Sequence, residues 1–322
     1  MKVTHFLSLS ATICLLAGAT AAQAQSWPQR PIRFVVPFAA GGSTDSIARI
    51  TAERLSVALG QPVVLENKPG ASGLIAVQTV QRAPSDGYTL LVAAMPVIVI
   101  LPKISPVPFD PLKDFVPITN FATNPFLLAV SKNVPVNTVK ELVDYAKPQA
   151  GKLNFASGGS GSVSHLSGAL FVKRAELDMM HISYKGDVPA VAAMIAGDVT
   201  MYFGNVPVLA PQAKAGNIKL LGVTSDKRLP ELPEVPTIAE TFPGFRTLTW
   251  NGLMAPAGTP TAIVDRIAME VKKIAADPTY QERMKQLGVQ IVADTPDEFR
   301  KAISADIDLF ADAIRSANLK VQ

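Results

Sequence analysis

Apolar residues along this chain occur in two alternating patterns. Short continuous apolar runs predict buried strands, and apolar residues at roughly helical spacing predict amphipathic helices. In the first part of the chain, strands are expected at 32–38, at 63–66 and within 86–94, and helices at 46–59 and 74–82. Gly60 is the expected C-cap of the first helix. Strands that alternate with helices at this spacing indicate βαβ units and a parallel sheet.

The alternation is interrupted once and then resumes. Residues 96–117 carry six prolines, which predicts a long irregular connection, and residues 118–131 restart as extended chain. The second block has predicted helices at 138–147, 164–175 and 189–196 and predicted strands at 153–156, 179–184, 199–203 and 218–225. After a second proline-rich stretch, residues 248–256 are expected to be extended, and helices are expected at 261–276, 278–286 and 296–316.

Two α/β blocks separated by two extended crossings, near residues 125 and 247, predict two lobes. The C-terminal helices have no sheet of their own, so they are expected to return to the first block. This assigns residues 25–124 and 248–322 to one lobe and residues 125–247 to the other. Two lobes joined by two strands form a hinged pair, and ligands of such proteins bind in the cleft between them.

Composition and the N-terminus restrict the protein class. The 322 residues are 48% apolar, and the formal net charge of +4 is scattered rather than gathered in a basic block, which argues against nucleic-acid binding. Residues 1–24 resemble a signal peptide with Ala22-Gln23-Ala24 as the cleavage signal, so export to the periplasm is expected. The alternative is an N-terminal anchor helix, but the apolar stretch is short for that. Cys14, the only cysteine, would leave with the signal peptide.

A glycine loop stands between the first predicted strand and the first helix. In "PFAAGGSTD", Gly41 and Gly42 allow close approach to the backbone, and Ser43 and Thr44 offer hydroxyl groups at a helix N-terminus, where backbone N–H groups favour anions. The dinucleotide and P-loop motifs are absent from the sequence, which disfavours a nucleotide. The alternative is a structural turn with Thr44 or Asp45 as the N-cap.

A similar loop occurs in the second block, where "NFASGGSGSVSHLSG" again joins a predicted strand to a helix. If the two loops face each other, a small anion with two carboxylates can be held between two helix N-termini. The alternative, a flexible linker, fits poorly with a loop inside an alternating block. Tyr184 and Lys185, in a strand-to-helix turn, and Gly204 and Asn205, expected just after a strand, can line the same rim; ordinary turn chemistry is the alternative for Lys185.

Catalytic and metal-binding patterns are weak. His165 and His181 remain after signal-peptide removal and form no metal motif, so neither a metal nor a cofactor is expected. His165 either touches a ligand or caps its helix, and His181 is expected to be structural. A secreted serine hydrolase using Ser160 or Ser162 with His165 is the competing interpretation, although no G-x-S-x-G motif is present.

Several stretches together resemble the Bug family, the substrate-binding proteins of tripartite tricarboxylate transporters. They are "WPQRPIRFVVPFAAGGSTDSIAR", "VVLENKPGASGLIA", "SDGYTLL", "NFASGGSGSVSHLSGALF", "HISYKGDVPAVAAMIAGDV", "LLGVTSDKRLPELPEVPTIAE" and "WNGLMAPAGTP". The resemblance implies a two-lobed periplasmic binding fold of the type II-like, Venus flytrap class. It also implies a carboxylate ligand, no catalytic activity, and a large and a small membrane permease subunit as partners. A sensor kinase is the alternative partner, and a monomer is expected.

The resemblance also implies which residues contact the ligand. With the rim residues named above, the expected ligand-binding set is Phe38, Ala39, Gly42, Ser43, Thr44, Asp45, Ser157, Gly158, Ser160, Ser162, His165, Tyr184, Gly204 and Asn205. The family often has aspartates where this chain has Ala193 and Gly204. If those positions face the cleft, the pocket is less acidic than usual, which would favour a plain or aromatic carboxylate over an amino acid.

Overall fold

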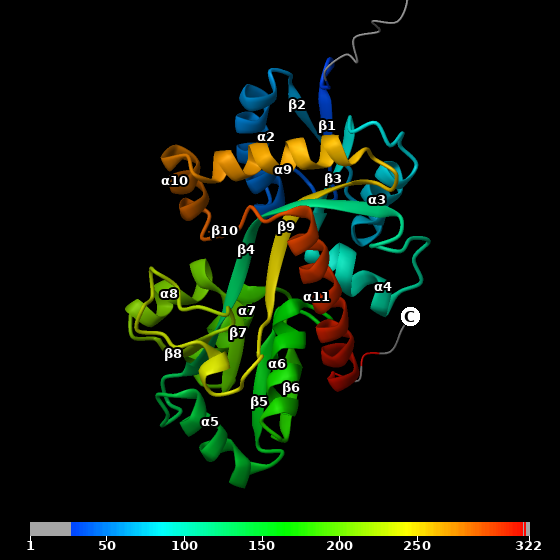
Figure 1. Ribbon diagram of the computed structural model, residues 1–322. Coiled ribbons are helices and arrows are strands. Elements are labelled where there is room, and N and C mark those ends of the chain that lie inside the picture. The colour runs from blue at the N-terminus through cyan, green and yellow to red at the C-terminus, as the bar shows by residue number, and fades with distance from the viewer. Residues whose placement is uncertain (1–26, 318, 320–322) are drawn as a thin grey trace, which may run out of the picture.

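The computed structural model describes residues 27–317 and 319 (Figure 1). The predicted signal peptide, residues 1–24, lies outside the described residues. Within the described part, none of the helices combines the length and apolar character that a membrane crossing requires.

The first lobe is built on three parallel strands. Their order is β2-β1-β3, and β9 continues the sheet antiparallel to β3. One face of the sheet packs against α2, α9 and α10, and the other packs against α3, the helical segment after β3, and α11. The elements are β1 (Ile32–Val36), α2 (Ser43–Leu59), β2 (Val63–Asn67), α3 (Leu74–Gln81), β3 (Thr89–Ala94), β9 (Leu248–Pro256), α9 (Thr261–Ala275) and α10 (Pro278–Gln286).

The second lobe repeats the arrangement with its own parallel strands. β7 pairs with β5 and β5 pairs with β6, while β7 and β8 both pair antiparallel with β4. Helices α7 and α8 cover one face, and α5 and α6 cover the other. The elements are α5 (Val139–Ala146), β5 (Leu153–Ser157), α6 (Val163–Arg174), β6 (Met179–Ser183), α7 (Asp187–Ala196), β7 (Met201–Asn205), α8 (Val206–Lys214) and β8 (Ile218–Val223).

One long strand, β4 (Phe115–Ser131), connects the two lobes (Figure 1). Its first part pairs with β9 and with the short β10 (Gln290–Ile291), and its last part pairs with β7 and β8. Strands β1 and β3 run parallel to each other and antiparallel to β9, so their carboxyl ends point toward the second lobe. Strands β5 and β7 end in the opposite direction, toward the first lobe. The two Gly/Ser loops therefore follow strand ends that face each other.

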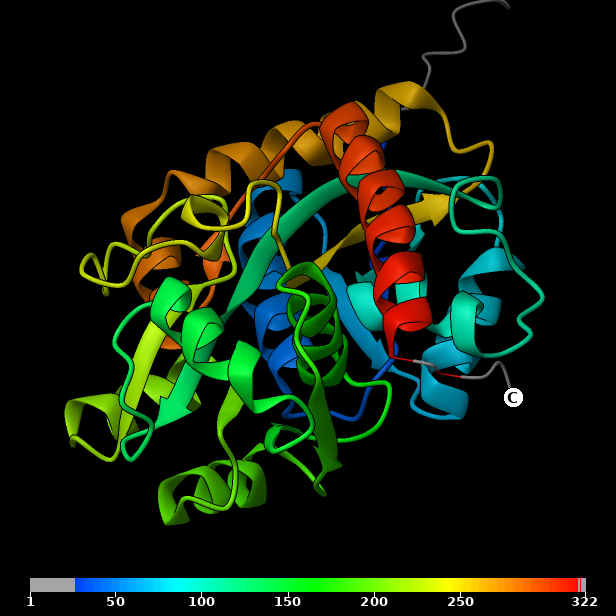
Figure 2. The same ribbon diagram turned by 90° about the horizontal axis from the view of Figure 1, so that it is seen from below.

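The C-terminal helix α11 (Pro296–Ser316) touches both lobes (Figures 1 and 2). Its buried apolar side chains join the core that includes Phe155 of β5 and Phe171 of α6. Near its end, Asp312 forms an ion pair with Lys173 of α6, with 2.7 Å between Oδ1 and Nζ. α9 and α10 return to the first lobe, whereas α11 also packs on the second.

The structure corrects three expectations from the sequence and adds one helix. The connection 96–117 is not wholly irregular, because a π-helical turn (Pro96–Ile100) and α4 (Leu101–Ile104) occupy its start. Helix α8 was not predicted, since Pro207 and Pro211 obscured its pattern. β7 runs two residues further than expected and includes Gly204 and Asn205. Helix α2 begins at Ser43 with Gly42 as its N-cap, so neither Thr44 nor Asp45 is the cap.

Candidate functional site

A cavity of about 400 Å³ lies where the facing strand ends meet the two connecting strands. Each lobe contributes to its wall, and β4 and β9 contribute their central residues. The lining consists of Phe38, Ser43, Thr44, Ala94, Pro96, Asn124, Pro125, Phe126, Asn205, Val206, Pro207, Val208, Thr249, Trp250, Asn251, Leu287 and Gly288. Within this described lining, every polar side chain is uncharged. The cavity can therefore bind an ion only through neutral donors and helix ends.

The first-lobe loop presents the N-terminus of α2 to this cavity. The first hydrogen bond within the helix runs from the Ser46 N–H to the Gly42 carbonyl at 2.9 Å, so the N–H groups of Ser43 and Thr44 precede it. Gly42 has no side chain to cap them, and residues 39–43 are exposed. Such a helix end carries roughly half a positive charge and favours anions. Thr44 and Ser43 add hydroxyl groups at the same place.

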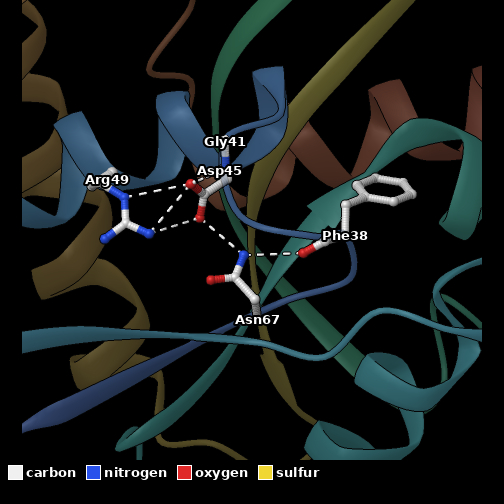
Figure 3. Close-up of polar contacts among 5 residues, drawn as sticks. All are labelled: Phe38, Gly41, Asp45, Arg49 and Asn67. Atoms are coloured by element: carbon white, nitrogen blue, oxygen red, sulfur yellow. Dashed lines mark hydrogen bonds and ion pairs between the residues drawn. The ribbon is translucent and has the colours of Figure 1, made fainter.

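Asp45 holds this loop in shape through a set of polar contacts (Figure 3). Its buried carboxylate accepts the Gly41 N–H at 2.9 Å, the Asn67 side-chain amide at 2.9 Å and the Arg49 guanidinium at 3.0 Å. The same Asn67 nitrogen donates to the Phe38 carbonyl at 3.0 Å. Burial opposes ionisation, but these donors hold the pKa of Asp45 below its usual value. The Asp45 side chain therefore positions the loop, and a direct contact between Asp45 and the ligand stays a prediction.

The second-lobe loop uses most of its donors internally. The Gly158 N–H donates to Ser164 Oγ, the Gly159 N–H to Ser157 Oγ, and the Gly161 N–H to His165 Nδ1, at 3.0, 3.2 and 3.1 Å. None of these residues lines the cavity. The exposed helix end at the cavity belongs to α2, and a second anion site at the second-lobe loop stays a prediction.

Two side chains of this loop have structural roles. Ser157 is fully buried, and its hydroxyl lies 2.7 Å from His181 Nε2. Ser162 is the N-cap of α6, where its hydroxyl accepts the His165 N–H and donates to the Gly159 carbonyl at 2.6 Å. Direct ligand contacts of these two side chains stay predictions. Ser160 is exposed and Gly158 is half-buried, both outside the lining of the cavity.

The His165 ring lies in a different hollow from the cavity. It stacks on His181 with ring centroids 3.7 Å apart, and both line a hollow beside α6 and the end of α11. Burial, followed by the neighbouring His181, lowers the pKa of His165 to about 4, so both rings are neutral near neutral pH. His165 Nδ1 accepts a backbone N–H, whereas the hydrolase interpretation requires a hydroxyl partner. A contact between His165 and the ligand stays a prediction.

The rim residues of the second lobe divide into two groups. Asn205 lines the cavity, as expected, while Tyr184 packs on the core beneath α7. Gly204 is a packing position, because a Cβ there would collide with the Tyr202 ring and with Leu209. Ala193 packs against the same core, and neither Ala193 nor Gly204 lines the cavity.

Sequence reasoning missed an acid beside the cavity and most of its back wall. Asp187 accepts the Tyr202 hydroxyl at 2.6 Å and the Asn205 amide at 3.1 Å. The back wall comes from β4 and β9, which supply Asn124, Thr249, Trp250 and Asn251. The available signal was the extended crossing at residues 248–256, whose middle had to lie between the lobes.

Comparison with known proteins gives the family. The family model described as "Tripartite tricarboxylate transporter family receptor", TctC, matches residues 47–319. This chain belongs to the TctC family. A UPF0065 protein from the tcbD-tcbE intergenic region of Pseudomonas sp. (strain P51) is 40% identical over 288 residues, which cover 88% of this chain and 86% of that protein. BugT of Bordetella pertussis is 32% identical and covers 100% of both chains.

Solved structures of TctC-like proteins share the fold. A TctC solute-binding protein from Polaromonas, without ligand, superposes with a TM-score of 0.84 at 27% identity and covers 90% of this chain and 99% of its own. An R. palustris protein solved with adipate superposes with a TM-score of 0.71 at 33% identity. The match covers 91% of this chain and 99% of that protein. The fold is thus a two-lobed periplasmic binding protein fold, and the TctC family is one of solute-binding receptors.

Proposed function

We propose that this TctC-family protein captures a small organic carboxylate between its lobes and delivers it to a transporter of the tripartite tricarboxylate type. The supporting observation is the cavity of about 400 Å³ that combines the exposed N-terminus of α2 with an uncharged lining. A carboxylate is small enough to be held by a few N–H and hydroxyl donors. The adipate found in the R. palustris relative belongs to the same chemical class.

The lining favours an acid with an apolar body. Phe38, Phe126 and Trp250 present aromatic surface, while Asn124, Asn205 and Asn251 offer amide groups. The Asn251 amide oxygen is buried with no hydrogen-bond partner among the described residues, so a ligand donor can satisfy it. Without lysine or arginine in the described lining, affinity depends on enclosing the ligand away from water, where dipoles act more strongly.

Closure of the lobes would provide that enclosure. We propose that residues 25–124 with 248–322 form one lobe, that residues 125–247 form the other, and that they close by hinge motion about β4 and the start of β9. We further propose that residues 1–24 direct export to the periplasm and are cleaved after Ala24. The partners would be permease subunits; a sensor kinase is the alternative that binding data alone do not separate.

Removal of the two hydroxyl groups at the start of α2 tests the anion site. The double variant Ser43→Ala/Thr44→Val is expected to weaken carboxylate binding by about a hundredfold or more, because each hydrogen bond to a charged group contributes roughly 1.5–3 kcal/mol. Isothermal titration calorimetry of the mature protein with a panel of mono-, di- and tricarboxylates measures this.

The matched control is Thr79→Val, which removes a hydroxyl from α3, where it bonds only to the Ile75 carbonyl. The control is expected to bind like the wild type. If the double variant and the control bind with equal affinity, the hydroxyl groups at the start of α2 do not contact the ligand. Turnover of ester substrates that is lost in Ser160→Ala or Ser162→Ala would instead favour the hydrolase.

A further inference from the structure

An aspartate lies behind the second-lobe wall of the cavity, at the N-terminus of a helix. Asp187 is the first residue of α7, so its carboxylate occupies the N-terminal end of a helix in the second lobe. It also lies against the Gly/Ser loop, because a Cβ at Gly158 would be only 2.8 Å from Asp187 Oδ1. The chain thus places its own anion at the position where the second lobe could offer donors to a ligand anion.

The donors around Asp187 are already committed to it. The Tyr202 hydroxyl donates to Oδ1 at 2.6 Å, and the Asn205 side-chain amide donates to Oδ2 at 3.1 Å. Both donors are neutral, so they stabilise the carboxylate without cancelling its charge. Tyr202 is fully buried, and burial together with Asp187 raises the pKa of its hydroxyl, which keeps it a donor.

Asn205 connects this acid to the cavity. Its side chain lines the cavity while it donates to Asp187, so the negative charge lies directly behind the second-lobe wall. The rest of that wall is Val206, Pro207 and Val208, which offer no charge to balance a ligand anion. The first lobe, in contrast, offers the exposed end of α2. The two ends of a bound ligand therefore meet opposite electrostatic environments.

We infer that Asp187 is a specificity-determining residue that makes this site select monocarboxylates, with an uncharged or cationic distal end, over dicarboxylates. The inference rests on the proposed function. The single ligand carboxylate binds at α2, and the distal end faces Asn205 and the apolar start of α8. A second ligand carboxylate would approach Asp187 as a like charge inside a partly dehydrated cleft, which is unfavourable.

The test compares acids of equal length by isothermal titration calorimetry with the mature protein. The pairs are hexanoate with adipate, pentanoate with glutarate and butanoate with succinate, and 6-hydroxyhexanoate adds a distal donor. The wild type is expected to bind the monocarboxylate of the best-fitting pair at least about tenfold more tightly. Asp187→Asn keeps the shape and removes the charge, and is expected to shift that ratio toward the dicarboxylate by about tenfold or more.

The matched control is Asp198→Asn, which makes the same charge change at the opposite end of the second lobe, before β7 begins. It is expected to leave the ratio unchanged. Equal or tighter dicarboxylate binding by the wild type, or a ratio that Asp187→Asn does not move, would overturn the inference and leave the proposed function intact. If Asp187→Asn fails to fold, the wild-type ratio alone decides. If no carboxylate binds, the proposed function itself is wrong.

Discussion

At the scale of single residues, one buried carboxylate both stabilises the core and orients a residue of the site. This residue is Asp306 of α11. It is almost fully buried, accepts the Trp250 indole N–H at 2.7 Å, and pairs with Arg246 at 2.9 Å. Since Trp250 lines the cavity, this carboxylate fixes the orientation of an aromatic wall residue from outside the site.

The stacked histidines predict a specific pH dependence of stability. The pKa of His165 falls to about 4 in the folded state, mainly through burial, against about 6.5 when exposed. Between these values the unfolded chain binds a proton that the folded chain refuses, so stability is lost as the pH falls from about 6.5 toward 4. His165→Asn keeps an acceptor for the Gly161 N–H and removes the titration, and should recover about 2 kcal/mol of that loss.

Urea unfolding on either side of this pH window, for the wild type and His165→Asn, measures the effect. The two proteins are expected to diverge as the pH is lowered, with the variant less sensitive. An identical pH dependence would mean that His165 titrates normally in the folded protein and that its stacking on His181 does not matter.

At the scale of secondary-structure elements, the site depends on how the loop before α2 is held. Asp45 ties together Gly41, Arg49 and Asn67, which come from the loop, from α2 and from β2. Asp45→Asn loses the charge that these donors stabilise and places an amide against the Asn67 amide. We expect a loss of about 1–3 kcal/mol in unfolding free energy and weaker ligand binding, because the loop is no longer fixed.

Chemical denaturation and calorimetry of Asp45→Asn test this together. The control is Asp110→Asn, which caps a surface turn through the Leu112 N–H and pairs with Lys113 away from the cavity. It is expected to bind ligand normally. If Asp45→Asn also binds normally while remaining folded, the loop does not need this support to form the site.

The sequence alone predicts much at this scale, with clear limits. The strand, glycine loop and helix around Gly42 and around Gly159 follow from local patterns, because each unit is contiguous in the chain. In the second loop, backbone N–H groups donate to the side chains of Ser164 and His165. These hydrogen bonds could not be predicted, since they depend on the rotamers of the two side chains. Asp187 was missed for a related reason: its partners Tyr202 and Asn205 reach it only after β7 and α7 have packed together.

At the scale of the whole molecule, the two lobes are joined by more than the two crossing strands. β4 passes through both sheets, and α11 adds contacts to both, including the Lys173–Asp312 ion pair at 2.7 Å. That exposed pair contributes little to stability. The cavity lies at the centre of this arrangement, and binding is expected to stabilise the molecule as a whole.

The most direct test of the central claim compares an acid with its own neutral amide. Calorimetry of the mature protein with the best-binding carboxylate and with the matching carboxamide isolates the anionic group while keeping size and shape. We predict binding of the acid and a loss of at least about a hundredfold for the amide, since the α2 N-terminus favours negative charge. Equal affinity for the two would contradict the claim that this cavity is a carboxylate site.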